Sequence, residues 1–176
     1  ALNTHGGSGP SGMDADGWRH ILASRSYVTA SEDLSNEFAK FVRSICTEKV
    51  EILQTGDTPN SSLEAFLACR LIPLDKNPGL RPIGIGEVLR RLAGKIVMSV
   101  AKGDVQEAVG SIQLCAGQPG GCEAAIHAMR SVYENNNTDA VLLMDAANAF
   151  NSINRKSMLI NIQKLCPIIF IYAFNC

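Results

Sequence analysis

Apolar residues recur with helical spacing along much of the chain, which is typical of helices that bury one face. The pattern predicts helices over about residues 14–24, 29–53, 87–102, 121–133 and 157–165. Only short apolar runs are left between them. The chain is therefore expected to combine long helices with a few short strands.

The second of these helices carries the clearest start signal. Thr29 and Glu32 stand at capping-box spacing, in which the first side chain caps the helix and the second reaches back to it. Behind them the apolar positions keep one helical face: Leu34, Phe38, Phe41 and Ile45. We therefore expect Thr29 to be the N-cap of this helix and the helix to end near Leu53.

Two strands joined by a tight turn are predicted over residues 67–74 and 81–85. Between them lies Asn77-Pro78-Gly79, which favours a turn because Pro presets one dihedral and Gly tolerates a positive φ. Residues 111–115 are a further short strand candidate. The five apolar residues 140–144 predict a strand covered on both faces. The expected fold class is α+β, rich in helix with short antiparallel strands.

Length and composition fit one globular domain. The chain has 176 residues, of which 46% are apolar and 19% charged, enough for one core and too few for two comfortable domains. Its six cysteines include no Cys-x-x-Cys pair, so a disulfide scaffold is not expected. The apolar tail over residues 167–174 is too short to cross a bilayer, and no membrane partner is expected. This apolar ending and a first residue other than Met lead us to expect a piece of a longer polypeptide.

Positive charge is concentrated in one part of the chain. The formal net charge is −1, but residues 70–102 hold seven basic and two acidic residues, which leaves about −6 for the remainder. Such a segment indicates a surface that faces a polyanion, although a solvated helix face would give the same pattern. Within it, the predicted helix has an apolar stripe that is widened on one side: Val88, Leu92, Ile96 and Val100, with Leu89, Ala93 and Val97.

Three segments together resemble one protein family. Residues 74–83 read Leu-Asp-Lys-x-x-Gly-x-Arg-Pro-Ile, a basic segment with Arg90 and Arg91 follows, and residues 145–150 read Asp-x-x-x-Ala-Phe after an apolar run. In this order they resemble the fingers and the first palm motif of reverse transcriptases from non-LTR and related retrotransposons. The Gly-rich segment 113–127 is similar to the family's approach to the palm.

The resemblance implies roles for individual residues. Lys76 and Arg81 match the fingers residues that contact the phosphates of the incoming nucleotide. Asp145 matches the first catalytic, metal-binding Asp, and Phe150 matches the aromatic residue that lies under the sugar and excludes a 2′-hydroxyl. Ala149, next to that ring, would also face the nucleotide. The basic helix residues expected to contact nucleic acid are Arg90, Arg91 and Lys95.

The activity implied for the intact protein is RNA-directed DNA synthesis. Such an enzyme uses two Mg²⁺ ions, with Mn²⁺ as a substitute, and its partners are an RNA or DNA template, a DNA primer and deoxynucleoside triphosphates. The implied organisation is a leader over residues 1–12, a fingers region over 13–135 and the beginning of a palm over 136–176. An intracellular location, in nucleus or cytoplasm, would follow.

One departure from the family pattern limits this interpretation. The family's second metal-binding element contains an Asp-Asp pair, and this sequence has none. The rest of the palm and the thumb are also missing, so this chain alone is expected to be inactive. A catalytically dead or co-opted nucleic-acid-binding remnant is the main alternative. A weaker one is an unrelated nucleotide-binding enzyme with a single metal held by Asp145.

Overall fold

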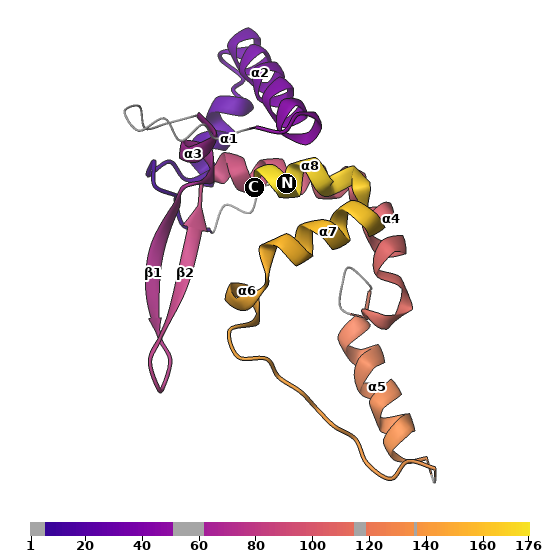
Figure 1. The fold of residues 1–176 in the computed structure, drawn as a ribbon. Helices are drawn as coiled ribbons and strands as arrows, with labels where there is room; N and C mark the ends of the chain where they lie inside the picture. The colour runs from indigo at the N-terminus through magenta and orange to yellow at the C-terminus, as the bar shows by residue number, and fades with distance from the viewer. Residues whose placement is uncertain (1–5, 51–61, 115–118, 136) are drawn as a thin grey trace. The chain divides into compact units, whose positions relative to one another are not determined.

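The computed structural model describes residues 6–50, 62–114, 119–135 and 137–176. These residues form a helix-rich structure with one two-stranded antiparallel sheet, which confirms the α+β class (Figure 1). The helices are α1 Ala15–Leu22, α2 Val28–Thr47, α3 Ser62–Leu67, α4 Val88–Val109, α5 Gly121–Tyr133, α6 Ala149–Ser152, α7 Arg155–Leu165 and α8 Phe170–Asn175. The strands are β1 Cys69–Asp75 and β2 Leu80–Gly86, and two short 3₁₀ helices are η1 Gly110–Ile112 and η2 Pro167–Ile169.

The chain divides into two compact units. The first contains Ala1–Val100 together with Ile171–Cys176, and the second contains Ala101–Phe170. The division falls inside α4, so the first half of this helix belongs to the first unit. The hairpin and the basic segment up to Lys95 therefore lie in the first unit, and Asp145 and Phe150 lie in the second.

The core of the first unit joins α2, α3 and the first half of α4. Its buried members are Val42, Ile45, Leu63, Phe66 and Ala93. The rings of Phe41 and Phe66 meet edge to face with centroids 5.0 Å apart, a geometry that aromatic pairs prefer. Packing of α2 on α3 and α4 thus accounts for the apolar face that the sequence predicted for α2.

The buried face of α4 is only part of the predicted stripe. Val88 and Ala93 are fully buried and Val97 packs against the core, whereas Ile96 is 40% and Val100 72% exposed. Two adjacent rows of this helix are apolar, and only one of them can face α2 and α3 at a given rotation of the helix. The sequence could not choose between the two rows, because both carry suitable residues.

The start of α2 differs from the prediction. The helix begins at Val28, one residue before Thr29, and Tyr27 at its N-cap makes no side-chain capping bond. Instead, Ser24 Oγ accepts a hydrogen bond from the Tyr27 N–H at 3.2 Å, and the buried Ser31 Oγ donates to the Ile21 carbonyl at 2.7 Å. The capping-box prediction is wrong because these bonds join α2 to the end of α1 and place its N-cap at Tyr27, two residues before Thr29.

The end of α2 is also earlier than expected, at Thr47 rather than near Leu53. Residues 48–50 are not helical, and 51–53 lie outside the described residues. Asn175, buried near the end of the chain, donates from Nδ2 to the carbonyls of Ile45 and Glu48 at 2.9 and 2.8 Å, and its Oδ1 accepts from the Val50 N–H at 3.0 Å. Asn175 therefore supplies partners for backbone groups that the end of a helix leaves unpaired.

The predicted hairpin is confirmed. β1 and β2 pair antiparallel from Cys69 opposite Gly86 to Asp75 opposite Leu80. The turn is closed by the Lys76 N–H, which donates to the Gly79 carbonyl at 2.9 Å, and Gly79 has φ +101°, a conformation that favours glycine. Pro73 lies opposite Pro82, which is tolerated because both strands are edge strands.

Two strand predictions in the second unit are wrong. Of the strand predicted over 111–115, residues 111 and 112 lie in the 3₁₀ helix η1, 113 and 114 are not in a strand, and Cys115 lies outside the described residues. Residues 140–144 have no regular structure. Leu142, Leu143 and Met144 are 80%, 80% and 87% exposed. A strand needs a neighbour for its backbone groups, and the described part of the chain provides none there.

The remaining predicted helices are confirmed. α1, α5 and α7 match the expected segments, and Asn154 caps α7 by accepting from the Ser157 N–H at 3.0 Å. The apolar tail forms η2 and α8, and Tyr172 from α8 packs against the core of the first unit. None of the helices that the structure describes combines the length and the apolar character needed to cross a membrane.

We expect Asn175→Ala to lower the free energy of unfolding of the first unit by about 1–3 kcal/mol, because buried backbone groups at the end of α2 lose their partners. Urea unfolding followed by circular dichroism measures this. The matched control is Asn161→Ala on α7, where an exposed amide donates only to the Ser157 carbonyl, and its effect should stay below about 0.5 kcal/mol. Equal effects would show that Asn175 does not hold the end of α2.

Candidate functional site

The tip of the β1–β2 hairpin carries Lys76 and Arg81, the two residues predicted to contact nucleotide phosphates. Arg81 lies opposite Leu74, and Lys76 follows the last pair of the ladder, Asp75 with Leu80. Residues directly opposite each other on two paired strands share a face of the sheet, so Leu74 and Arg81 lie on one face. Lys76 comes two residues after Leu74, at the start of the turn. The hairpin therefore places the two cationic residues on either side of the same turn.

Both cationic side chains at the tip are exposed, and neither forms an ion pair with a residue in the described part of the chain. The strands that carry them are exposed as well, with Leu71 71% and Leu80 65% accessible. In Figure 1 the hairpin extends away from α3, at which it starts. Lys and Arg on such a projecting turn can offer a point charge and a planar fork to one phosphate chain.

The base of the hairpin is held by Arg90, in the first turn of α4. Its Nη1 donates to the Leu67 carbonyl at 2.9 Å and to Cys69 Sγ at 3.3 Å. Nη2 of the next residue, Arg91, donates to the Gly7 carbonyl at 2.7 Å. These two arginines therefore fix the hairpin and the leader to α4, and nucleic-acid contact by them and by the exposed Lys95 stays a prediction.

The predicted palm residues lie in the second unit. Asp145 is exposed in the irregular segment that precedes α6, and Ala149 and Phe150 lie in α6. Asn148, which starts this helix, adopts a left-handed conformation with φ +51°. The hairpin with Lys76 and Arg81 belongs to the first unit, and Asp145 belongs to the second.

The fit of a metal ion to Asp145 is incomplete. Mg²⁺ takes about six oxygen ligands, and one carboxylate supplies one or two of them. Among the described residues, no group of three or more His, Cys, Asp or Glu side chains is placed to hold a metal ion. The described residues alone thus do not form the two-metal site that the family resemblance implies.

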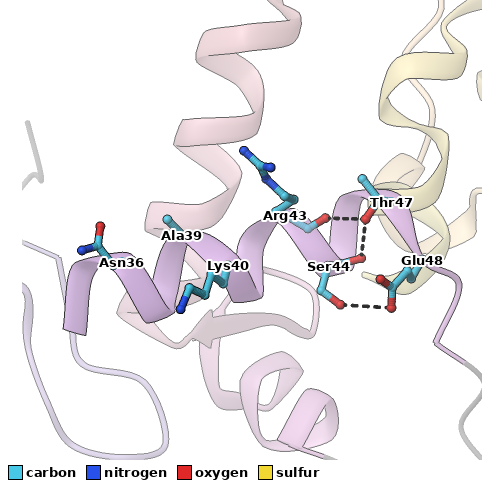
Figure 2. A pocket seen from close by; sticks show the side chains of 7 residues that line it. All are labelled: Asn36, Ala39, Lys40, Arg43, Ser44, Thr47 and Glu48. Atoms are coloured by element: carbon cyan, nitrogen blue, oxygen red, sulfur yellow. Dashed lines mark hydrogen bonds between the residues drawn. The ribbon is translucent and has the colours of Figure 1, made fainter. Parts of the chain in front are cut away.

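A hollow of about 580 Å³ lies along α2, and the described residues that line it come from that helix and from Glu48, which follows its last residue (Figure 2). Their contacts are local. Thr47 Oγ1 donates to the Arg43 carbonyl at 3.0 Å, and Ser44 Oγ donates to Glu48 at 3.5 Å. Lys40, also on its wall, pairs with Glu37 at 2.6 Å. These are ordinary bonds of a solvated helix face, and no nucleophile or acid–base pair is assembled there.

A second hollow, of about 550 Å³, lies at the base of the hairpin. Its described lining residues are Gly7, Cys69, Gly84, Ile85, Gly86, Arg90, Arg91 and Tyr172. Burial, followed by the charge of Cys176 and a hydrogen bond with it, raises the pKa of Tyr172 to about 12, although Arg90 acts in the opposite direction. The Tyr172 hydroxyl therefore stays protonated at neutral pH and can donate a hydrogen bond.

Sequence reasoning missed this second hollow. Its residues come from the leader, the hairpin, α4 and α8, and Gly7 and Tyr172 are far apart along the chain. The only signal available was the basic segment that contains Arg90 and Arg91.

Comparison of the chain with protein-family models, with curated proteins and with solved structures finds no match in any of the three.

Stability measurements can separate the roles of the arginines. We expect Arg90→Ala to lower the free energy of unfolding by about 1–3 kcal/mol, because the Leu67 carbonyl loses a charge-assisted hydrogen bond. Arg81→Ala should change it by less than about 0.5 kcal/mol, because Arg81 is exposed and forms no ion pair with a described residue. Urea unfolding tests both. A loss at Arg81 as large as that at Arg90 would mean that Arg81 supports the fold rather than facing a ligand.

Proposed function

We propose that this chain carries the fingers and the first palm motif of a retroelement reverse transcriptase. The observation that carries the proposal is the hairpin tip, where Lys76 on the turn and Arg81 near the start of β2 are exposed without an ion-pair partner among the described residues. In this proposal the tip holds the phosphates of a deoxynucleoside triphosphate. The order of the three sequence segments adds support, since the basic hairpin precedes the Asp-x-x-x-Ala-Phe segment as it does in that family.

The anchoring of the hairpin fits this role. An isolated two-stranded hairpin is only marginally stable in water, and Arg90 ties the base of this one to the first turn of α4. A tip that must close on a nucleotide needs a fixed base and a free end, because positioning of the phosphates is most of the catalytic task in phosphoryl transfer. The hairpin has both properties.

The exposed segment around Asp145 is consistent with an incomplete palm. In the proposal, residues 140–144 become a buried strand only when neighbouring palm strands pair with them, which would cover Leu142, Leu143 and Met144. Asp145 would then share a Mg²⁺ site with carboxylates that are not in this sequence, and Phe150 would lie under the sugar.

A nucleic-acid-binding remnant without catalysis is the second candidate. It is favoured by the basic residues of 70–102, which could neutralise backbone phosphates in the absence of any chemistry. The two candidates differ in what the hairpin tip recognises. The first requires recognition of a nucleotide triphosphate, and the second requires recognition of a strand.

The chain by itself should not extend a primer with either Mg²⁺ or Mn²⁺, because it contains one of the expected metal carboxylates and no Asp-Asp pair. A primer-extension assay with residues 1–176 on an RNA template measures this. Extension by a purified, monomeric chain would show that the site is not the one proposed.

The decisive test uses a polypeptide in which this chain is joined to a complete palm and thumb. Arg81→Ala should raise the barrier for nucleotide incorporation by about 2–4 kcal/mol, as loss of a charged group facing the reacting phosphates does. Template affinity should change little. Arg43→Ala on the exposed face of α2 is the matched control for loss of one positive charge.

The alternative gives a different result in the same assay. If Arg81 contacts a strand backbone, Arg81→Ala weakens template binding and lowers its salt dependence by about one unit of slope. Nucleotide use would then fall only in proportion to template binding, which would favour the nucleic-acid-binding candidate.

A further inference from the structure

The hollow at the base of the hairpin is separate from the tip that the proposed function uses. Its volume of about 550 Å³ lies within the range of about 300–1,000 Å³ that small-molecule sites occupy. All its described lining residues belong to the first unit. It is therefore a site within one unit that can be considered independently of Lys76, Arg81 and Asp145.

Three guanidinium groups gather around this hollow. Arg90 and Arg91 line it directly. Nη2 of Arg70, on β1, lies 3.5 Å from the position that a Cβ on Gly7 would take. None of the three forms an ion pair with a carboxylate among the described residues. Like charges around one hollow repel one another, and a bound anion would reduce that cost.

The acidic residue next to the hollow does not cancel this charge. Glu87 lies between the lining residue Gly86 and α4, and its two carboxylate oxygens accept from the Ser11 N–H and hydroxyl at 2.7 and 2.8 Å. Three arginines and one glutamate leave a local charge of about +2. Arg90 and Arg91 also stand in the first turn of α4, where the helix dipole disfavours cations.

Arg91 has a buried donor without a partner. Its Nη2 donates to the Gly7 carbonyl at 2.7 Å, but its buried Nε finds no hydrogen-bond acceptor among the described residues. A buried N–H of a charged group is costly to leave unpaired, and such groups in folded proteins normally have an acceptor. Among the described residues, protein acceptors therefore compensate the Arg91 charge only in part.

The other walls suit a phosphate attached to a larger group. Gly84 and Gly86 carry no side chain, and a Cβ on Gly86 would lie 3.7 Å from Arg90 Nη1 and so fill space beside that cation. The Tyr172 hydroxyl lies 3.2 Å from the Cβ position of Gly94, which puts it against the face of α4. This hydroxyl already has a hydrogen bond with Cys176, and it places a neutral polar group beside the guanidinium groups.

We propose that the hollow lined by Arg90, Arg91 and Tyr172, with Arg70 near its lining residue Gly7, binds the phosphate group of a nucleotide, either free or within a strand. Arg91 and Arg70 provide the charge that selects the phosphate, Arg90 contributes from its fixed position at the hairpin base, and the volume accommodates the attached sugar. The site uses none of the residues of the hairpin tip, so binding of a free nucleotide here is independent of the proposed polymerase function. Binding of a strand here rests on the nucleic-acid-binding role proposed for the basic residues 70–102.

The test is titration of the 176-residue chain with deoxyadenosine monophosphate by isothermal calorimetry, with deoxyadenosine as the ligand that lacks phosphate. A second titration uses a single-stranded oligonucleotide without terminal phosphates, which offers only backbone phosphates. Arg91→Gln and Arg70→Gln should each weaken binding of the phosphate-bearing ligand at least tenfold. Arg43→Gln, which removes one exposed charge from α2, should change it less than twofold.

The outcomes separate the two sources of phosphate. Binding of the monophosphate with the expected arginine dependence assigns a free nucleotide, and binding of the oligonucleotide alone with the same dependence assigns a strand. Binding of deoxyadenosine as tightly as its monophosphate, equal losses with Arg43→Gln, or no binding of either ligand would overturn the proposal. Circular dichroism shows whether Arg91→Gln folds. If it does not, the substitution of the exposed Arg70, Arg70→Gln, decides the question alone. A tenfold loss of affinity then supports the site, and an unchanged affinity overturns it.

Discussion

Burial of one face of α4 against α2 and α3 is the constraint on which the rest of the first unit depends. Ala93 is fully buried in the core with Val42, Ile45 and Phe66, and this fixes the rotation of α4 about its axis. With the rotation fixed, Arg90 leaves the helix where it reaches the Leu67 carbonyl, at the start of the hairpin. The position of the hairpin base is thus a consequence of apolar packing one turn further along the same helix.

The last residues of the chain complete this arrangement. Asn175 pairs with backbone groups at the end of α2, and Tyr172 packs against the core and brings its hydroxyl close to Gly94 of α4. The Lys49 ammonium lies 5.2 Å from the centre of the Phe174 ring, within the range of a cation–π contact. Polar and aromatic contacts therefore hold α8 to segments far earlier in the sequence, namely α4, the end of α2 and the residues that follow α2.

The sequence predicted correctly those elements whose formation depends on neighbouring residues in the chain. The hairpin follows from Asn77-Pro78-Gly79, and α2, α4 and α5 follow from their apolar spacing. The strand over residues 140–144 could not be predicted correctly, because an apolar run becomes a strand only when another strand pairs with it. The capping box at Thr29 failed for a related reason, since the bond from Ser31 to Ile21 depends on where α1 ends.

In the candidate site, too, features set by neighbouring residues were predictable from the sequence, and features set by long-range contacts were not. The sequence alone could place Lys76 and Arg81 close together, because it predicted a tight turn between them. Charge counting identified the basic segment, but it could not show that Arg90 is held by the Leu67 carbonyl or that Arg91 reaches Gly7. Those contacts join residues 23 and 84 positions apart, and Tyr172 enters the same hollow from the other end of the chain.

The central claim is that the hairpin tip, on its fixed base, receives the phosphates of a nucleotide. The most direct measurement is amide chemical-shift mapping of the ¹⁵N-labelled chain during titration with a deoxynucleoside triphosphate in the absence of divalent metal. The account predicts saturable shifts of the amides from Asp75 to Arg81, with those on the exposed face of α2 unchanged. Unshifted tip amides at nucleotide concentrations that saturate any other part of the chain would contradict it.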